Sequence, residues 1–149
     1  MLSYEDTAAM ADWLVRAFGF VEAVRLYDAS GTVTHVELRH DSGAIMLSTP
    51  SPDYRSPSSH RRECAFADAW LATTNVVDGV LVRVTDVDDH YHRASKAGAT
   101  ILTVPMDAGP GRLYRAGDPE GHRWMFIQQS DPERPSPQEV VSGRLDLIR

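Results

Sequence analysis

The residues whose types and spacing could do chemistry lie on one segment in which apolar and polar side chains alternate. Val36 and Leu38 fall on one side of that segment, and His35, Glu37 and Arg39 fall on the other. On an extended strand the polar trio would therefore share one face. A His–Glu pair placed in this way could serve as general acid and base in a lyase or isomerase reaction. The competing interpretation is a solvated sheet face that carries cross-strand ion pairs.

The elements that position this trio follow from the spacing of the apolar residues. In the first half, a helix is predicted to begin after the N-cap Asp6 and to stop at Gly19. The strands expected around it are 2–5, 21–27, 32–40 and 44–48. In the second half, a helix capped by Thr85 or Asp86 is expected to end at Gly98. The strands expected around that helix are 80–84, 100–104, 112–116 and 122–129.

An internal repeat relates these two halves. Gly19 and Gly98, the two helix stops, are 79 positions apart, and the same offset places Asp6 on Thr85. It also places the strand 44–48 on residues 123–127. Each half then has the order strand, helix, strand, strand, strand. The sequence therefore predicts an α+β fold built from two similar modules.

The segment that joins the halves is expected to be largely loop. Residues 50–63 are rich in proline and serine, and a short helix is expected within 64–76 around Phe66 and Trp70. His90 and His92 lie two apart on the second predicted helix, so they do not share a face and are expected at the surface.

Composition excludes several classes of protein. The chain has 149 residues and a formal net charge of −6, which argues against nucleic acid as a partner and fits a neutral or cationic ligand better. Cys64 is the only cysteine, so no disulfide framework can form. The first residues do not read as a signal peptide, and no apolar run is long enough to span a membrane. We therefore expect a cytoplasmic protein without membrane or nucleic-acid partners.

The ordered set of short motifs resembles the vicinal oxygen chelate superfamily, which includes glyoxalase I, extradiol dioxygenases and bleomycin-resistance proteins. The motifs are ADWL at 11–14, FGF at 18–20, GAIML at 43–47, VRVTDVD at 82–88, AGA at 97–99 and DPEGHRW at 118–124. The resemblance covers residues 2–129 as a single domain. It implies βαβββ modules at about 2–49 and 77–129, joined by the loop 50–76 and followed by a tail, 130–149. It also implies cupped mixed β-sheets around a cleft, with the helices outside.

The same resemblance locates the metal ligands of the metal-dependent members, which are His or Glu side chains. Three of the four positions fall on Met46, Gly79 and Met125, and the fourth would precede Met1. Zinc and hard divalent cations prefer imidazole nitrogen or carboxylate oxygen, which these residues do not offer. We therefore expect no bound metal and no other cofactor, and a metal-dependent glyoxalase or dioxygenase is the less favoured activity.

If Met46 and Met125 occupy the former ligand positions, they face the cleft, where methionine would favour contact with an aromatic molecule. The alternative is that both methionines only fill space. Strand alternation extends the expected ligand-binding set on the same face. Its members are Met46, Met125, Ser48, Leu81, Arg83, Arg39 and Arg123.

These observations favour a binding protein for a small hydrophobic or aromatic molecule, similar to the bleomycin-resistance proteins that sequester drugs. The alternative from a different class is a metal-free lyase or isomerase that uses His35 and Glu37. A homodimer is also expected, because the superfamily often completes its clefts between two subunits and the segment from Phe66 to Trp70 offers apolar surface.

Overall fold

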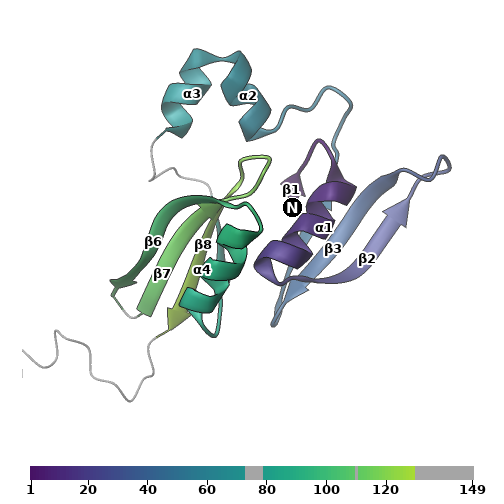
Figure 1. The fold of residues 1–149 in the computed structure, drawn as a ribbon. Coiled ribbons are helices and arrows are strands. Elements are labelled where there is room, and N and C mark those ends of the chain that lie inside the picture. The colour runs from purple at the N-terminus through teal and green to yellow at the C-terminus, as the bar shows by residue number, and fades with distance from the viewer. Residues whose placement is uncertain (73–78, 110, 130–149) are drawn as a thin grey trace, which may run out of the picture.

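The computed structural model describes residues 1–72, 79–109 and 111–129, so the predicted tail 130–149 lies outside the described residues. The first module contains β1 (Leu2–Ser3), α1 (Thr7–Phe18), β2 (Val21–Tyr27), β3 (Val33–His40) and β4 (Gly43–Ser48). The second contains β5 (Val80–Arg83), α4 (Val87–Lys96), β6 (Thr100–Ala108), β7 (Gly111–Gly117) and β8 (Arg123–Gln129). Both modules are βαβββ units, which confirms the predicted fold class (Figure 1).

Each module forms its own four-stranded mixed sheet. The strand orders are β1-β4-β3-β2 in the first sheet and β5-β8-β7-β6 in the second. The first pair of each order is parallel and the other pairs are antiparallel. The second order repeats the first, strand for strand, so the internal repeat seen in the sequence is a repeat of topology.

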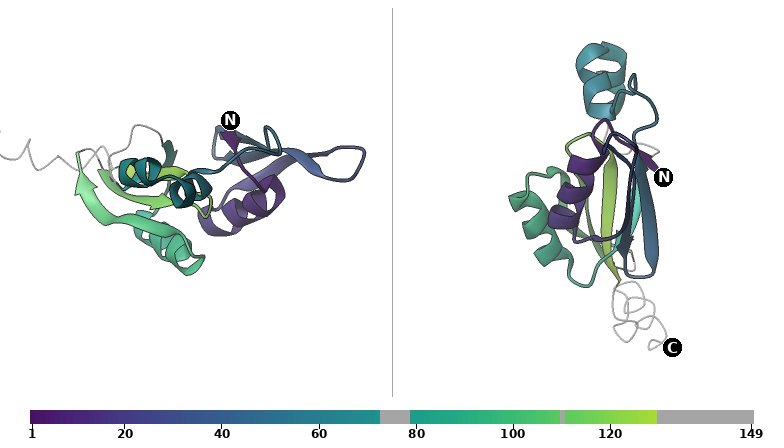
Figure 2. Two further views of the ribbon diagram at one scale, coloured as in Figure 1. Left: turned by 90° about the horizontal axis from the view of Figure 1, so that it is seen from above. Right: turned by 90° about the vertical axis from the view of Figure 1, so that its right-hand side faces the viewer.

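The two long helices lie in one layer and the strands in another. α1 and α4 stand on the same side of the two sheets, as the right-hand view of Figure 2 shows. Direct bonds join the helices: Trp13 Nε1 donates to the carbonyl of Ala97 at 3.0 Å, and Arg93 Nε donates to the carbonyl of Ala17 at 3.3 Å. Neither α1 nor α4 packs on the opposite face of either sheet.

The helix boundaries follow from their caps. The Asp6 carboxylate accepts from Ala9 N at 2.9 Å, and Gly19 ends α1 in the left-handed region with a φ of 75°. In the second module Asp86, not Thr85, is the N-cap, and its carboxylate accepts from Asp89 N at 2.9 Å.

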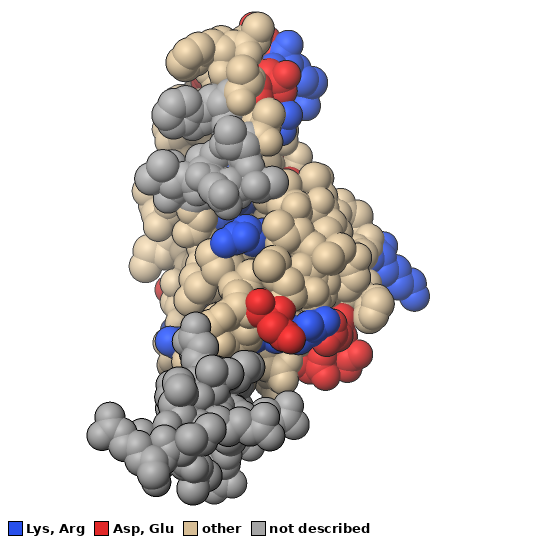
Figure 3. Space-filling view, turned by 90° about the vertical axis from the view of Figure 1, so that its left-hand side faces the viewer, with Lys and Arg blue, Asp and Glu red and all other residues tan. Residues whose placement is uncertain are grey.

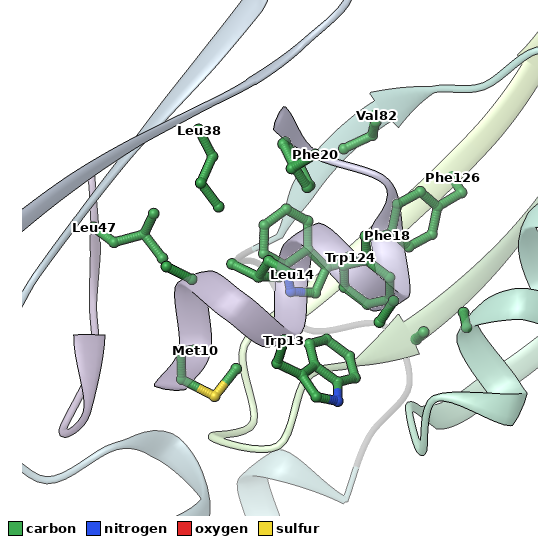
Figure 4. Packing of buried hydrophobic residues seen from close by; sticks show 14 of the residues in the cluster. Met10, Trp13, Leu14, Phe18, Phe20, Leu38, Leu47, Val82, Trp124 and Phe126 are labelled. Atoms are coloured by element: carbon green, nitrogen blue, oxygen red, sulfur yellow. The ribbon is translucent and has the colours of Figure 1, made fainter. Parts of the chain in front are cut away.

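A single hydrophobic core joins the two modules through the helix layer. Phe18, the last residue of α1, lies at its centre, with ring centroids 5.3 Å from Trp124 and 4.7 Å from Phe126 of the other module. Figure 4 shows these rings packed together with Phe20 and Leu14. The modules therefore share one core.

His90 belongs to this core, so the prediction of a surface position for it is wrong. The side chain is 4% exposed. Nδ1 is 2.7 Å from the hydroxyl of Tyr114, and Nε2 is 3.1 Å from the carbonyl of Phe18. Burial lowers the pKa of His90 to about 4. His92, the other histidine of α4, is exposed, as expected.

The joining segment is a loop over 50–56, as expected, but residues 57–63, which were also expected to be loop, form a helix. α2 (Pro57–Glu63) and α3 (Ala65–Leu71) form a pair that stands away from the sheets (Figure 1). Ser56 caps α2 and Pro57 occupies its first turn, where a missing amide hydrogen has no cost. The prolines and serines that suggested a loop are thus a helix start. The helix predicted around Phe66 is present as α3, and residues 73–76 of the predicted linker are outside the described part.

Candidate functional site

The open faces of the two sheets are the surfaces on which the expected site residues lie. We call the face of each sheet opposite α1 and α4 its open face. Buried Val36 and Leu38 point to the helices, so their strand neighbours point the other way. In sheet 1 the open face carries His35, Glu37, Arg39, Ala44, Met46 and Ser48, and in sheet 2 it carries Leu81, Arg83, Leu113, Arg115, Arg123, Met125 and Ile127.

On sheet 1 the structure brings the polar trio together with Met46. Glu37 pairs with Met46 across β3 and β4, and His35 pairs with Ser48. The Glu37 carboxylate accepts from Arg39 at 3.2 Å, which is an ion pair within one strand. Met46 is 46% exposed, so its side chain is accessible. Sheet 1 therefore offers one accessible apolar side chain, Met46, beside a carboxylate that is paired with Arg39.

On sheet 2 the structure brings Leu81, Arg83, Arg123 and Met125 together. Leu81 pairs with Met125 along the parallel strands β5 and β8, and Arg83 pairs with Ile127 one step further. Leu81 is 53% exposed. Arg123 lies two residues before Met125 on the same face, and burial together with nearby Arg61 lowers its pKa.

Arg115 is an open-face residue that the sequence analysis did not identify. It pairs with Met125 from the other side, across β7 and β8. Alternation with buried Tyr114 and Ala116 could have placed it on this face. The other expected residues were placed from strands on which the superfamily holds its metal ligands, or from the polar alternation of β3, and β7 is neither.

The donor set on the open faces does not fit a divalent metal. The positions expected from the sequence for metal ligands, Met46, Gly79 and Met125, carry no imidazole or carboxylate. Among the described residues, no three His, Cys, Asp or Glu side chains lie close enough together to hold an ion. The nearest acid to Met46 across the strands, Glu37, is already bound to Arg39. The open-face residues that the structure describes therefore do not offer the donor set that zinc or a hard divalent cation prefers.

Residues 1–126 match the sequence profile of the Glyoxalase/Bleomycin resistance protein/Dioxygenase superfamily. The chain belongs to this superfamily. Mb0911c from Mycobacterium bovis is 33% identical over 128 residues, which cover 85% of this chain and 79% of that protein.

Solved structures of the superfamily share the fold. TioX from Micromonospora sp. ML1 is 34% identical, with a TM-score of 0.63, covering 87% of this chain and 94% of that one. TnmS3, an antibiotic binding protein from Streptomyces sp. CB03234, is 19% identical, with a TM-score of 0.58, covering 87% and 93%. The second likeness concerns the fold alone. Over the described residues, no helix of this superfamily member is long and apolar enough to cross a membrane.

Proposed function

We propose that this protein binds a small hydrophobic or aromatic molecule on the open faces of its sheets, without a metal and without chemical turnover. The observation that carries the proposal is the apolar centre of each open face, which is Met46 on sheet 1 and Met125 beside exposed Leu81 on sheet 2. Methionine adapts its shape and makes favourable contacts with aromatic rings. TnmS3, which shares the fold, is an antibiotic binding protein, so the fold can serve this purpose.

The proposal includes a homodimer that covers the open faces. Apolar side chains remain exposed there: Val21 at 67%, Leu26 at 52% and Met46 at 46% on sheet 1, and Leu81 at 53% on sheet 2. Exposed apolar surface often marks a contact with another protein, because the contact removes it from water. A second copy laid over these faces would enclose a site that one chain leaves open. Phe66, named in the expectation of a dimer, is exposed on α3, while the side chain of Trp70 is outside the described part.

The competing function is a metal-free lyase or isomerase that uses His35 and Glu37. Both side chains share the open face, as the strand alternation predicted. The contact that weighs against a base at Glu37 is its ion pair with Arg39, which occupies one of its oxygens. Among the described open-face residues, Glu37 is the only acid beside His35.

Thermal-shift measurements separate the functions. Aromatic antibiotics, the methylglyoxal–glutathione adduct and catechols would be added with and without chelator, and each would then be recovered and analysed. A compound that raises the melting temperature and returns unchanged supports binding. Replacement of Met46 and Met125 by serine should abolish the shift, whereas the matched Val15→Ser change on the outer face of α1 should leave it. Turnover that survives chelator but is lost in His35→Ala would overturn the proposal in favour of the enzyme.

Metal content tests the proposal that the protein binds its ligand without a metal. Protein prepared without an affinity tag should contain less than one equivalent of any transition metal by elemental analysis. A stoichiometric metal that chelator removes, with loss of ligand binding, would contradict the metal-free assignment.

A further inference from the structure

Two arginines lie on the open face of sheet 2, one on each side of β8. They are Arg83 on β5 and Arg115 on β7. None of the described residues at open-face positions of this sheet is Asp or Glu. This local charge is opposite in sign to the net charge of −6 of the whole chain.

The other face of the same sheet shows the kind of acidic partner that Arg83 and Arg115 lack among the described residues. Arg112 also lies on β7, but it points to the helix side. There Asp88 of α4 accepts from its Nε at 3.0 Å, and Asp107 of β6 accepts from its Nη1 at 3.2 Å. Side chains of opposite sign also lie against one another on the side of the molecule shown in Figure 3. Neither Arg83 nor Arg115 has a carboxylate within 4.0 Å in the described part of the chain.

The two arginines flank the apolar part of the face. Arg115 is level with Met125 on one side of β8, and Arg83 is level with Ile127 on the other. On a regular sheet this arrangement separates their Cα atoms by about 12 Å. Long side chains that start on both sides of β8 can therefore approach one group held above Met125. Guanidinium groups bind planar anions such as carboxylate through two parallel hydrogen bonds.

Resting on the proposed function, we propose that the ligand is an aromatic molecule that carries an anionic group, such as a carboxylate or a sulfonate. The anionic group lies between Arg83 and Arg115, and the aromatic part lies on Met125 and Leu81. Sheet 1 does not compete for the anion, because its Arg39 is already paired with Glu37. Arg83 and Arg115 lie next to the ligand, so they, and not the net charge of the chain, determine that the ligand carries a negative charge.

Two fluorescent probes with the same ring system test this inference. 1-Anilinonaphthalene-8-sulfonate carries an anionic group, and 1-anilinonaphthalene lacks it. At low salt the sulfonate should bind about tenfold more tightly, since two partly exposed ion pairs together give about that factor. Added salt should reduce the preference, because it screens exposed charges.

Variants locate the preference. The double change Arg83→Gln and Arg115→Gln should weaken the sulfonate about tenfold and change the neutral probe by less than about twofold. Arg16→Gln on the exposed side of α1 removes the same kind of charge away from the face and should leave both affinities unchanged. Circular dichroism and melting temperature would confirm that each variant is folded.

The possible failures are distinct. If both probes bind equally and respond to Met125→Ser, the proposed function stands and the anionic ligand is wrong. If neither probe binds at all, the proposed function fails and the inference fails with it. If the double variant changes the mass of the particle in solution without changing the ratio of the two affinities, the arginines serve a subunit contact, and the inference is overturned.

Discussion

The hydroxyl of Tyr4 donates a 2.7 Å hydrogen bond to the carboxylate of Asp118, which lies 114 positions later in the chain. The same carboxylate accepts from Trp124 Nε1 at 3.0 Å and from His122 N at 2.9 Å. Tyr4 is fully buried and Asp118 is 2% exposed. Burial and the neighbouring Asp118 raise the pKa of Tyr4, so its hydroxyl remains a donor. The DPEG turn thus joins the two modules as well as reversing the chain.

Removal of the Tyr4 hydroxyl should destabilise the fold. In Tyr4→Phe the buried carboxylate keeps its other two donors and loses one charge-assisted bond, which costs about 1.5–3 kcal/mol. Urea denaturation would measure the change. Tyr27→Phe is the matched control, because Tyr27 is 60% exposed and the change there should stay within about 0.5 kcal/mol. Equal effects of the two changes would mean that the bond to Asp118 contributes little.

His90 should make the protein less stable in mild acid. Its pKa falls from 6.5 in the unfolded chain to about 4 in the folded state, where burial disfavours the charged ring. Between these values the unfolded state binds more protons, so stability is complete above pH 6.5 and is lost as the pH falls toward 4. The loss from this group amounts to at most about 3 kcal/mol.

The measurement is the free energy of unfolding as a function of pH, for the natural chain and for His90→Gln. The glutamine variant cannot gain a proton at this position, so its stability curve should be flatter over this range. His92→Gln, an exposed neighbour on α4, should keep the slope of the natural chain. A His90→Gln curve parallel to that of the natural chain would assign the acid sensitivity to other groups.

Gly121 should tolerate a side chain less well than Gly31. Both have positive φ, 91° and 84°, so alanine carries about 1–2 kcal/mol of backbone strain at either position. A Cβ at Gly121 would also lie 2.7 Å from Ser58 Oγ and 2.9 Å from Ser58 N, whereas Gly31 has nothing within 4 Å. Gly121→Ala should therefore cost about 1–3 kcal/mol more than Gly31→Ala in thermal unfolding. Equal costs would show that the start of α2 moves freely away from the turn.

The elements themselves could be predicted because their signals are local. The alternation along β3 placed His35, Glu37 and Arg39 on one face, and Asp6 and Gly19 set the limits of α1. The DPEG turn at Asp118 was equally visible. In each case the deciding contacts lie within a few residues of sequence.

The parts that could not be predicted depend on contacts between the modules. His90 is buried because Phe18 of the other module supplies its carbonyl and ring. The role of Asp118 depends on Tyr4, which no local pattern connects to it. Within the second module, alternation could have placed Arg115 on the open face, but its position beside Met125 depends on the register of β7 and β8. The register of neighbouring strands and the docking of the two modules depend on tertiary contacts. The two-residue period of a strand alone does not determine them.

The exposed apolar residues of the edge strand β2 give the last prediction, on assembly. Val21 and Leu26 are 67% and 52% exposed on the open face of sheet 1, so covering each would contribute about 1 kcal/mol. Light scattering at micromolar concentration should give twice the 16.5 kDa of the chain. The double change Val21→Lys and Leu26→Lys should give the mass of one chain, because two lysines per copy would have to enter the contact. Val15→Lys, on the exposed side of α1, should leave the dimer intact. A natural chain that scatters as 16.5 kDa would contradict the dimer and leave the open faces to the ligand alone.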